Sequence, residues 1–366
     1  MNQPISKILF VITSMGAGGA EKVCITLAEQ LSKKNGFKIS IVYFYPESTL
    51  LDEVHKSVEI THLSSSKLIY GLPKLYSYLR NNNPDYIIAN IWPLTIISII
   101  CNMLNFNNKA KLITVEHSYL KEDFKNKNYF FKLLANLSIS LFYKFANANV
   151  AVSSACKNDL QSRSKTNVSI INNPIEEPRS NFPLSNSFQS WYDSNDLKLI
   201  SVGTLKKQKN YLLQIKACKQ LQDMGIKFKH LIIGDGEERE NIKKLINDYD
   251  LKESILLAGY QKHPHIYLQH ADIFLLTSDY EAFGNVIVEA LYAGIKIIAR
   301  NDNSGAGEIL KNGEFGELFY GDNPKNLANL ISNTAMQSVS REKMILRAKE
   351  YSPQKIVREY ERLLGI

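Results

Sequence analysis

The chain has 366 residues, which exceeds one ordinary hydrophobic core, excludes a single small domain and predicts two domains. Hydrophobic residues make up 45% and charged residues 22%, as in a soluble globular protein. The formal net charge is +8 and is uneven: residues 1–180 carry 20 Lys+Arg against 13 Asp+Glu, and residues 181–366 carry 24 against 23. A basic half indicates an anionic partner, either a phosphate-bearing substrate or a membrane surface, unless it is only a solvated surface.

The cysteines and the apolar stretches indicate a chain that stays in a reducing cytoplasm. The cysteines lack metal-ligand or redox spacing; they are Cys24, Cys101, Cys156 and Cys218. The apolar run Ile8–Thr13 is too short for a signal peptide. Asn, Pro or Lys residues interrupt two longer apolar stretches, at 86–106 and 129–146. We expect the first to be a buried strand, a turn at Trp92-Pro93 and a buried helix, and the second to be an amphipathic helix.

Strands and helices alternate along the first half. The first strand, Lys7–Thr13, runs into the glycine-rich turn 14–21 and then a helix through Leu31. This turn predicts either a backbone that approaches a ligand near Gly18 and Gly19, or simply a tight strand-to-helix turn. Further strands are expected at Phe37–Tyr43, Val58–Leu63, Tyr86–Ile91, Lys111–Val115, Asn149–Ser153 and Val168–Asn172. Such alternation predicts a parallel sheet whose ligands bind beyond the carboxyl ends of the strands, where Gly18 and His117 fall.

The alternation restarts after residues 178–195, which are rich in Ser, Asn and Pro and are interpreted as a linker. The expected strands are Lys198–Gly203, His230–Gly234, Ile255–Ala258, Ala271–Thr277 and Lys296–Arg300. Helices are expected at Asn210–Met224, Glu237–Tyr249, His265–His270, Asn323–Ala335, Arg341–Ala348 and Pro353–Leu364. The chain therefore consists of two similar α/β halves, and a site between them is the natural hypothesis.

Residues 278–290 place a helix start between two carboxylates. Gly284 frees the backbone at the turn, and Asn285 is expected to be the N-cap of the helix that follows. Glu281 precedes this helix start and Glu289 lies about one turn inside it. Unpaired amides at a helix start suit a diphosphate and carboxylates suit hydroxyls, so the stretch suits a sugar nucleotide. A capped amphipathic helix with two solvated acids fits the same residues.

At this point the chain resembles the retaining glycosyltransferases of family 4, of the GT-B architecture. The resemblance covers essentially the whole length and is closest to bacterial enzymes of capsule, O-antigen (lipopolysaccharide) and lipid-linked glycan synthesis. The motifs that carry it, in order, are Gly18-Gly19-Ala20-Glu21, Glu116-His117-Ser118, Val202-Gly203 through Lys209-Asn210, Gly234-Asp235-Gly236, Gly259-Tyr260, and the acid pair Glu281 and Glu289.

The resemblance implies two Rossmann-like domains facing each other across a cleft. The N-terminal acceptor-side domain would comprise 1–177 and about 352–366, because the C-terminal helix crosses back to it. The linker would be 178–195, and residues 196–351 would form the nucleotide-sugar-binding domain. The implied reaction moves a sugar from a nucleotide-diphosphate sugar, UDP-linked by expectation, to a growing lipid-linked glycan.

The resemblance also implies roles for the matching residues. Glu281 would contact the donor sugar, Glu289 the ribose hydroxyls, and His117 the reacting face of the sugar. Lys209 would neutralise the diphosphate. The remaining donor-side positions are Gly18, Gly19, Gly203, Thr204, Gly234, Tyr260, Gln261, Phe283, Gly284 and Asn285. One position departs from the family, because Thr204 stands where an Arg usually pairs with the downstream Lys, and Lys206 or Lys207 is a possible substitute.

No cofactor or metal is expected. The leaving phosphate can be stabilised by a helix start and Lys209, and the single Asp-x-Asp sequence, Asp248-Tyr249-Asp250, lies at a predicted helix end away from the other motifs. On the acceptor side Lys125, Lys127 and Lys132 lie among aromatic residues. Basic and aromatic residues together suit an anionic membrane surface or a lipid-linked pyrophosphate, although a core-packing helix with solvated lysines fits them too. No nucleic-acid motif appears, and the expected location is the cytoplasm, peripheral on the inner face of the bacterial inner membrane.

Two other functions stay open from the residues. The departure at Thr204 fits a non-catalytic protein that binds a sugar nucleotide. Glycine-rich turns after strands also occur in nicotinamide- or flavin-dependent oxidoreductases, although the full dinucleotide fingerprint is missing here.

Overall fold

The computed structural model describes residues 5–16, 18–106, 109–178, 188, 191, 195–301 and 305–366. The chain divides into two compact units, residues 1–176 with 351–366 and residues 177–350. The linker predicted at 178–195 lies almost wholly outside the described residues. Both units are α/β with a parallel sheet, which confirms the predicted fold class.

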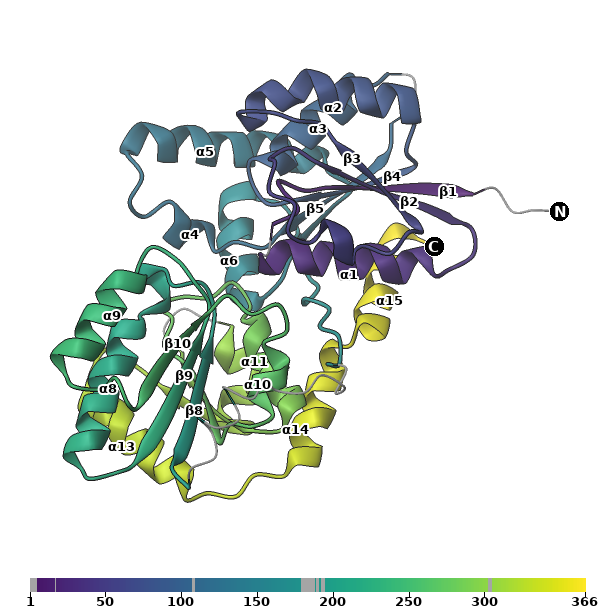
Figure 1. Cartoon of the computed structure of the whole chain (residues 1–366). Helices are drawn as coiled ribbons and strands as arrows, with labels where there is room; N and C mark the ends of the chain where they lie inside the picture. Colours follow the sequence, from purple (N-terminus) through teal and green to yellow (C-terminus); the bar gives the residue numbers. More distant parts are fainter. Residues whose placement is uncertain are drawn as a thin grey trace. The chain divides into compact units, whose positions relative to one another are not determined.

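The first unit is built on a parallel sheet in the order β3-β2-β1-β4-β5-β6-β7. Its strands are β1 (Ser6–Val11), β2 (Phe37–Tyr43), β3 (Val58–His62), β4 (Tyr86–Asn90), β5 (Lys111–Glu116), β6 (Ala148–Ala151) and β7 (Ser169–Ile170). Its helices are α1 (Gly19–Ser32), α2 (Leu68–Asn82), α3 (Leu94–Leu104), α4 (Leu120–Asp123), α5 (Tyr129–Phe142), α6 (Ser154–Ser164) and α15 (Pro353–Leu364), with short 3-10 turns at Leu51–Glu53 and Tyr143–Phe145. Figure 1 shows α1 on one side of this sheet and α2 and α3 on the other, as in a doubly wound sheet.

The second unit has a parallel sheet in the order β10-β9-β8-β11-β12-β13. Its strands are β8 (Leu197–Val202), β9 (Phe228–Ile233), β10 (Ile255–Gly259), β11 (Ile273–Leu276), β12 (Lys296–Arg300) and β13 (Glu317–Phe319). Its helices are α8 (Tyr211–Asp223), α9 (Arg239–Asp248), α10 (His265–Leu268), α11 (Asn285–Ala293), α12 (Ala306–Ile309), α13 (Pro324–Ala335) and α14 (Arg341–Ala348), with 3-10 turns at Lys207–Lys209, Lys311–Gly313 and Lys349–Tyr351. Figure 1 shows α8 and α9 on one side of the sheet and α10 and α11 on the other.

The apolar stretch at 86–106 folds as expected. Strand β4 is buried, the Trp92–Pro93 peptide bond is cis, and α3 buries most of its residues. None of the helices that the structure describes combines the length and the apolar character needed to cross a membrane.

The last helix, α15, belongs to the first unit although it ends the chain. It packs against α1 and buries Ile356, Val357, Tyr360 and Leu364 along one face. Lys34, just beyond the end of α1, forms an ion pair with Glu361. The predicted return of the C-terminal helix to the N-terminal half is therefore confirmed.

Candidate active site

Each sheet has one point where the chain order reverses, and ligands of such sheets bind beyond the carboxyl ends of the strands there. In the first unit this point lies between β1 and β4, and in the second between β8 and β11. The predicted residues follow the strands around these points. Because the strands are parallel, their carboxyl ends share one edge of the sheet, and the topology gathers residues that are far apart in the sequence.

In the second unit the predicted donor residues follow β8, β9, β10 and β11, which are neighbours in the sheet. Gly203 and Thr204 follow β8, Gly234 follows β9, Tyr260 and Gln261 follow β10, and Glu281 with Phe283, Gly284 and Asn285 follows β11. Glu289 lies inside α11.

The ends of β8 and β9 approach each other so closely that only glycine fits at Gly234. Its φ is +136°, and a Cβ placed there would lie 1.9 Å from the carbonyl oxygen of Gly203. The Gly234 amide also donates to the carbonyl of Gly259 at 2.9 Å. Gly234, which the resemblance places among the donor-side residues, is therefore required for the packing of the backbone itself.

Lys209 and Glu281 form an ion pair at the centre of this edge. Lys209 Nζ donates to Glu281 Oε1 at 2.5 Å, and the hydroxyl of Ser278 donates to the same oxygen at 2.6 Å. Glu281 is only 9% exposed. The aliphatic part of Lys209 passes beside Gly203, where a Cβ would lie 3.6 Å from Lys209 Cε. Two residues that are 72 positions apart in the sequence are thus held in direct contact.

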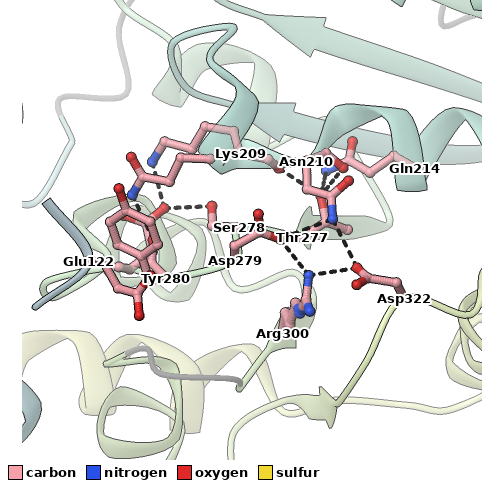
Figure 2. Close-up of polar contacts among 12 residues, drawn as sticks. Glu122, Lys209, Asn210, Gln214, Thr277, Ser278, Asp279, Tyr280, Arg300 and Asp322 are labelled. Carbon is pink, nitrogen blue, oxygen red and sulfur yellow. Dashed lines mark hydrogen bonds and ion pairs between the residues drawn. The ribbon is translucent and has the colours of Figure 1, made fainter. Parts of the chain in front are cut away.

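The two loops that carry this pair, 207–210 and 277–281, are joined along their length (Figure 2). The Asp279 amide donates to the carbonyl of Gln208 at 2.8 Å, and Gln208 Nε2 donates to the carbonyl of Tyr280 at 2.7 Å. The Thr277 hydroxyl lies 3.0 Å from the carbonyl of Lys209 and 3.1 Å from that of Asn210. These bonds set the distance between the loops before any ligand arrives.

A charged cluster supports the two loops from the side of β12. Arg300, at the end of β12 and only 8% exposed, donates through Nη1 to Asp279 at 2.6 Å and to Asp322 at 2.8 Å (Figure 2). Asn210 Nδ2 donates to the same two carboxylates at 3.1 Å and 3.0 Å. We call Asn210, Asp279, Arg300 and Asp322 the Arg300 cluster. It connects three segments of the second unit to the Lys209 loop.

A neutral chain of hydrogen bonds supports the loops from within the core. Gln214 Nε2 donates to the Thr277 hydroxyl at 2.8 Å, and the Ser201 hydroxyl lies 2.9 Å from Gln214 Oε1. His230 Nε2 lies 3.2 Å from the same Ser201 hydroxyl. Burial lowers the pKa of His230 to about 3, so its ring is neutral at physiological pH. Buried polar groups paired in this way favour one arrangement of the backbone that they bind.

The start of α11 differs in one detail from the expectation. Asn285 is the first residue of the helix, and the N-cap is Gly284, which lies in the left-handed region at φ +104° and makes no side-chain cap bond. The prediction of Asn285 as N-cap was therefore wrong: glycine adopts this backbone conformation without the strain that a Cβ would add. Phe283, just before the turn, is buried.

Lys206 and Lys207, the two lysines considered as substitutes for the missing arginine, lie away from the Lys209–Glu281 pair. Thr204 is exposed. Lys206 and Lys207 line a cavity of about 320 Å³ whose walls include Asn210, Asp279 and Asp322, and neither Lys209 nor Glu281 is among its lining residues. In the part of this unit that the structure describes, Lys209 is the cation that lies beside Gly203 and Glu281.

The two positions after β10 differ from each other. The Tyr260 side chain is exposed. The Gln261 side chain donates to the carbonyl of Ala258 at 3.0 Å and accepts from the Tyr267 hydroxyl at 3.0 Å. Gln261 therefore supports the β10 end, whereas Tyr260 is open to solvent.

In the first unit, His117 follows β5 and is held by Asn90 at the end of the neighbouring β4. Asn90 Nδ2 donates to the carbonyls of Val11 and Ile88, so its oxygen faces His117 Nε2 at 3.0 Å and the ring must donate from Nε2. Burial lowers the pKa of His117 to about 4, and the Asn173 side chain opposes this shift only in part. His117 is therefore a neutral imidazole with a defined tautomer.

Glu116, just before His117, is fully buried. Its carboxyl accepts the amide of Trp92 at 3.1 Å and that of Ser118 at 3.1 Å. Burial nevertheless raises its pKa to about 8, against these two hydrogen bonds. Glu116 thus ties the turn after β4 to the segment that carries His117.

Gly18 and Gly19 form the start of α1 at the end of β1, as predicted. A Cβ on Gly18 would lie 2.1 Å from Glu21 Oε2, so this glycine leaves room for the Glu21 carboxylate. Burial raises the pKa of Glu21. The Ser14 hydroxyl, which donates to Glu21 Oε1 at 3.4 Å, opposes this shift in part. In the described ranges, no group of three or more His, Cys, Asp or Glu side chains is placed to hold a metal ion.

Sequence reasoning missed the residues that position the predicted ones. Asn90, Ser278, Asp279, Arg300 and Asp322 had no assigned role. A weak signal existed for two of them, because Asn90 and Arg300 are polar residues at the carboxyl ends of buried strands. Their partners come from other strands, so no local pattern could have paired them.

The chain matches two family descriptions: "Glycosyltransferase Family 4" over residues 17–179 and "Glycosyl transferases group 1" over residues 185–351. It therefore belongs to the family 4 glycosyltransferases of GT-B architecture. These matches favour a glycosyltransferase over the oxidoreductase that the sequence analysis left open.

Similar proteins span essentially the whole chain. A Campylobacter jejuni protein named N-acetylgalactosamine-N,N'-diacetylbacillosaminyl-diphospho-undecaprenol 4-alpha-N-acetylgalactosaminyltransferase is 29% identical, covering 97% of this chain and 98% of its own length. The amylovoran biosynthesis glycosyltransferase AmsD of Erwinia amylovora is 25% identical over 98% and 99%. Among solved structures, Anabaena HepE in complex with UDP-glucose superposes with a TM-score of 0.82 at 20% identity, covering 98% and 99%. That likeness, at this identity, supports the fold.

The Arg300 cluster leads to a prediction on stability. Arg300→Met leaves two carboxylates without their shared cation, and both are partly exposed, so the free energy of unfolding should fall by about 1–2 kcal/mol. Asp322→Asn removes one charge from the exposed side of the cluster and should cost about 0.5 kcal/mol or less. Urea denaturation of both variants beside the parent protein measures the difference. Equal stability of all three proteins would contradict the role given to Arg300.

Glu116 leads to a prediction on pH dependence. Because its folded pKa is raised from 4.5 to about 8, its contribution to stability is fully present below the unfolded value and is lost as pH rises through about 8. Glu116→Gln removes this titration. The free-energy difference between the parent and the variant should therefore fall by on the order of 3 kcal/mol from about pH 5 to about pH 8.

The measurement is urea denaturation of both proteins at a series of pH values in this window. The contribution of His117 is common to the two proteins and cancels. A difference that does not change with pH would mean that the buried carboxyl is already ionised at low pH.

Proposed function

We propose that the protein is a retaining, metal-independent glycosyltransferase that takes a UDP-linked sugar and extends a lipid-linked bacterial surface glycan. The observation that carries the donor site is the Lys209–Glu281 pair, held between two joined loops at the switch point of the second sheet. UDP as the nucleotide is supported by the similar fold of HepE, which was solved with UDP-glucose.

The charges of the site suit the departure of a nucleoside diphosphate. Negative charge grows on the leaving phosphate, and an enzyme lowers the barrier by holding fixed positive potential where that charge develops. Lys209 supplies a full charge, and the start of α11 supplies the positive end of a helix dipole. In the free protein Lys209 is paired with Glu281, so we infer that the diphosphate takes over Lys209 and the donor sugar takes over Glu281.

The other residues receive the positions that the family implies. Glu289 in α11 would bind the ribose hydroxyls, and the base would lie near Gly234 and the exposed Tyr260. His117 is neutral, because burial lowers its pKa to about 4, so we assign it a hydrogen bond to a sugar hydroxyl and no proton donation at neutral pH. Retention would follow from attack on the face of the sugar that the diphosphate leaves.

The acceptor is proposed from the relatives. The Campylobacter jejuni relative is named for a diphospho-undecaprenol acceptor, and the Erwinia amylovora relative for amylovoran biosynthesis. The basic first half of this chain suits a lipid-linked pyrophosphate. Such an acceptor would place the enzyme peripherally on the cytoplasmic face of the inner membrane.

Charge-neutral substitutions test the donor site. Lys209→Met and Glu281→Gln should each reduce transfer by at least roughly 100-fold, because each removes a group that acts on the developing charge or positions the sugar. Lys207→Met is the matched control, since Lys207 lines a cavity whose walls include neither Lys209 nor Glu281, and it should keep near-parent activity. A thermal-shift panel of UDP, GDP and ADP and their sugars first identifies the donor.

Full transfer by both site variants would remove the site assignment. A UDP-induced shift in the melting temperature without transfer to any lipid extract and without UDP release would instead favour a non-catalytic sugar-nucleotide-binding protein.

The mechanism makes a separate prediction about the product. NMR of the product formed from an α-linked donor should show an α-linkage, and turnover should persist in EDTA because Lys209 and the α11 start supply the positive potential. A β-linked product would overturn retention. Loss of turnover in EDTA with recovery on adding a divalent cation would overturn metal independence.

A further inference from the structure

Helix α5 exposes an apolar face that nothing in the described residues covers. Tyr129 is 81% exposed and Phe130 67%, and about half of each leucine side chain on this face is open to solvent. The exposed members are Tyr129, Phe130, Leu133, Leu134, Leu137 and Leu141, and we call them the α5 stripe. Contiguous exposed apolar surface of this kind marks an interaction site in a soluble protein.

The stripe is a single surface because of its helical spacing. At 3.6 residues per turn its members fall within an arc of about 140° around the helix axis. Ala135 and Ile139, the buried residues of α5, lie outside this arc. The helix packs on α3 and α6 and lies on the outside of the first unit (Figure 1). The side of α5 that carries Ala135 and Ile139 therefore packs into the core, and the stripe faces outward.

Positive charge flanks the stripe at both ends. Lys127 lies over the Phe131 ring, with Nζ 5.9 Å from the centroid, and Lys144 lies over Phe145 at 5.3 Å. Both lysines are exposed. Two of the lysines predicted to face a membrane are held locally: Lys125 pairs with Glu122 at 3.1 Å, and Lys132 donates to the carbonyl of Lys125. We therefore infer that Lys127 and Lys144 are the cations that contact the binding partner of the stripe.

The acids near this end of the helix do not reverse its charge. Glu122 is paired with Lys125. Burial raises the pKa of Asp123, and Asp159 pairs with Arg163 at 2.8 Å. An apolar face between exposed cations is the combination that binds anionic phospholipid, because the apolar side chains enter the acyl boundary while lysines contact headgroups.

We propose that the α5 stripe docks the enzyme on an anionic phospholipid surface, with the helix lying in the plane of the membrane. The 14 residues of α5 span about 21 Å, too short to cross a hydrocarbon core of about 30 Å. The inference deepens the proposed function by naming the surface that brings the enzyme to its lipid-linked acceptor. It does not depend on the identity of the donor.

Vesicle co-sedimentation of the full chain tests the proposal. We expect binding to phosphatidylglycerol–phosphatidylethanolamine vesicles and little binding to phosphatidylcholine vesicles. Leu133→Gln with Leu137→Gln should weaken binding by at least roughly tenfold, since two apolar side chains no longer enter the bilayer. Lys127→Ala with Lys144→Ala should weaken it by about fivefold per lysine, and added salt should reduce binding of the parent protein.

Matched controls separate docking from general effects. Leu346→Gln changes an exposed leucine on α14, and Lys252→Ala an exposed lysine after α9; both should bind vesicles as the parent does. The shift in melting temperature caused by UDP should be unchanged in all of these variants, because the stripe belongs to the first unit and the loops that carry Lys209 and Glu281 belong to the second. If UDP caused no shift in the parent protein while vesicle binding remained, the result would contradict the proposed UDP-linked donor and leave the docking proposal standing.

Three results would overturn the proposal. The parent protein could fail to bind anionic vesicles, or the double leucine variant could bind them as well as the parent does. Alternatively, sedimentation equilibrium could show that the stripe mediates a dimer, with the leucine variant monomeric and vesicle binding absent.

Discussion

The arrangement of the second unit depends on one constraint: the loops 207–210 and 277–281 must lie side by side. Thr277, Asp279 and Gln208 join them through backbone groups, and this brings Lys209 into contact with Glu281. Without that register a lysine and a buried glutamate would each be left uncompensated, which is costly in a water-poor site. The Arg300 cluster holds the same loops from one side (Figure 2). The Gln214–Ser201–His230 chain holds them from within the core.

In the first unit, side-chain hydrogen bonds rather than ion pairs hold the segment that carries His117. Asn90 binds two carbonyls and thereby turns its oxygen to His117, while the buried Glu116 accepts the amide of Trp92 after β4 and the amide of Ser118 after His117. Burial moves the two pKa values in opposite senses, so at neutral pH the histidine is neutral and the glutamic acid is largely protonated. The neighbouring residues Glu116 and His117 therefore carry little charge at neutral pH, in contrast with the ion pairs of the second unit.

Several parts of the fold were predictable from local patterns. Alternating buried strands and helices predicted two parallel sheets, and the apolar stretch 86–106 predicted β4 before Trp92-Pro93 and α3 after it. The motif glycines were predictable as well, although Gly234 proves necessary because a Cβ would collide with the Gly203 carbonyl. Asn285 was wrongly predicted as an N-cap, since a sequence pattern does not reveal that Gly284 occupies the left-handed conformation there.

From the sequence alone, motifs predict which residues carry the chemistry, namely Lys209, Glu281, Glu289 and His117, and the alternation of strands and helices predicts that they lie near the carboxyl ends of the strands. Only the tertiary structure decided what each of them contacts. Arg300 meets Asp279 and Asp322 because parallel strands end at a common edge, a proximity that sequence separation conceals. The α5 stripe shows the same limit, because spacing predicts an apolar face but only packing reveals that the face stays uncovered.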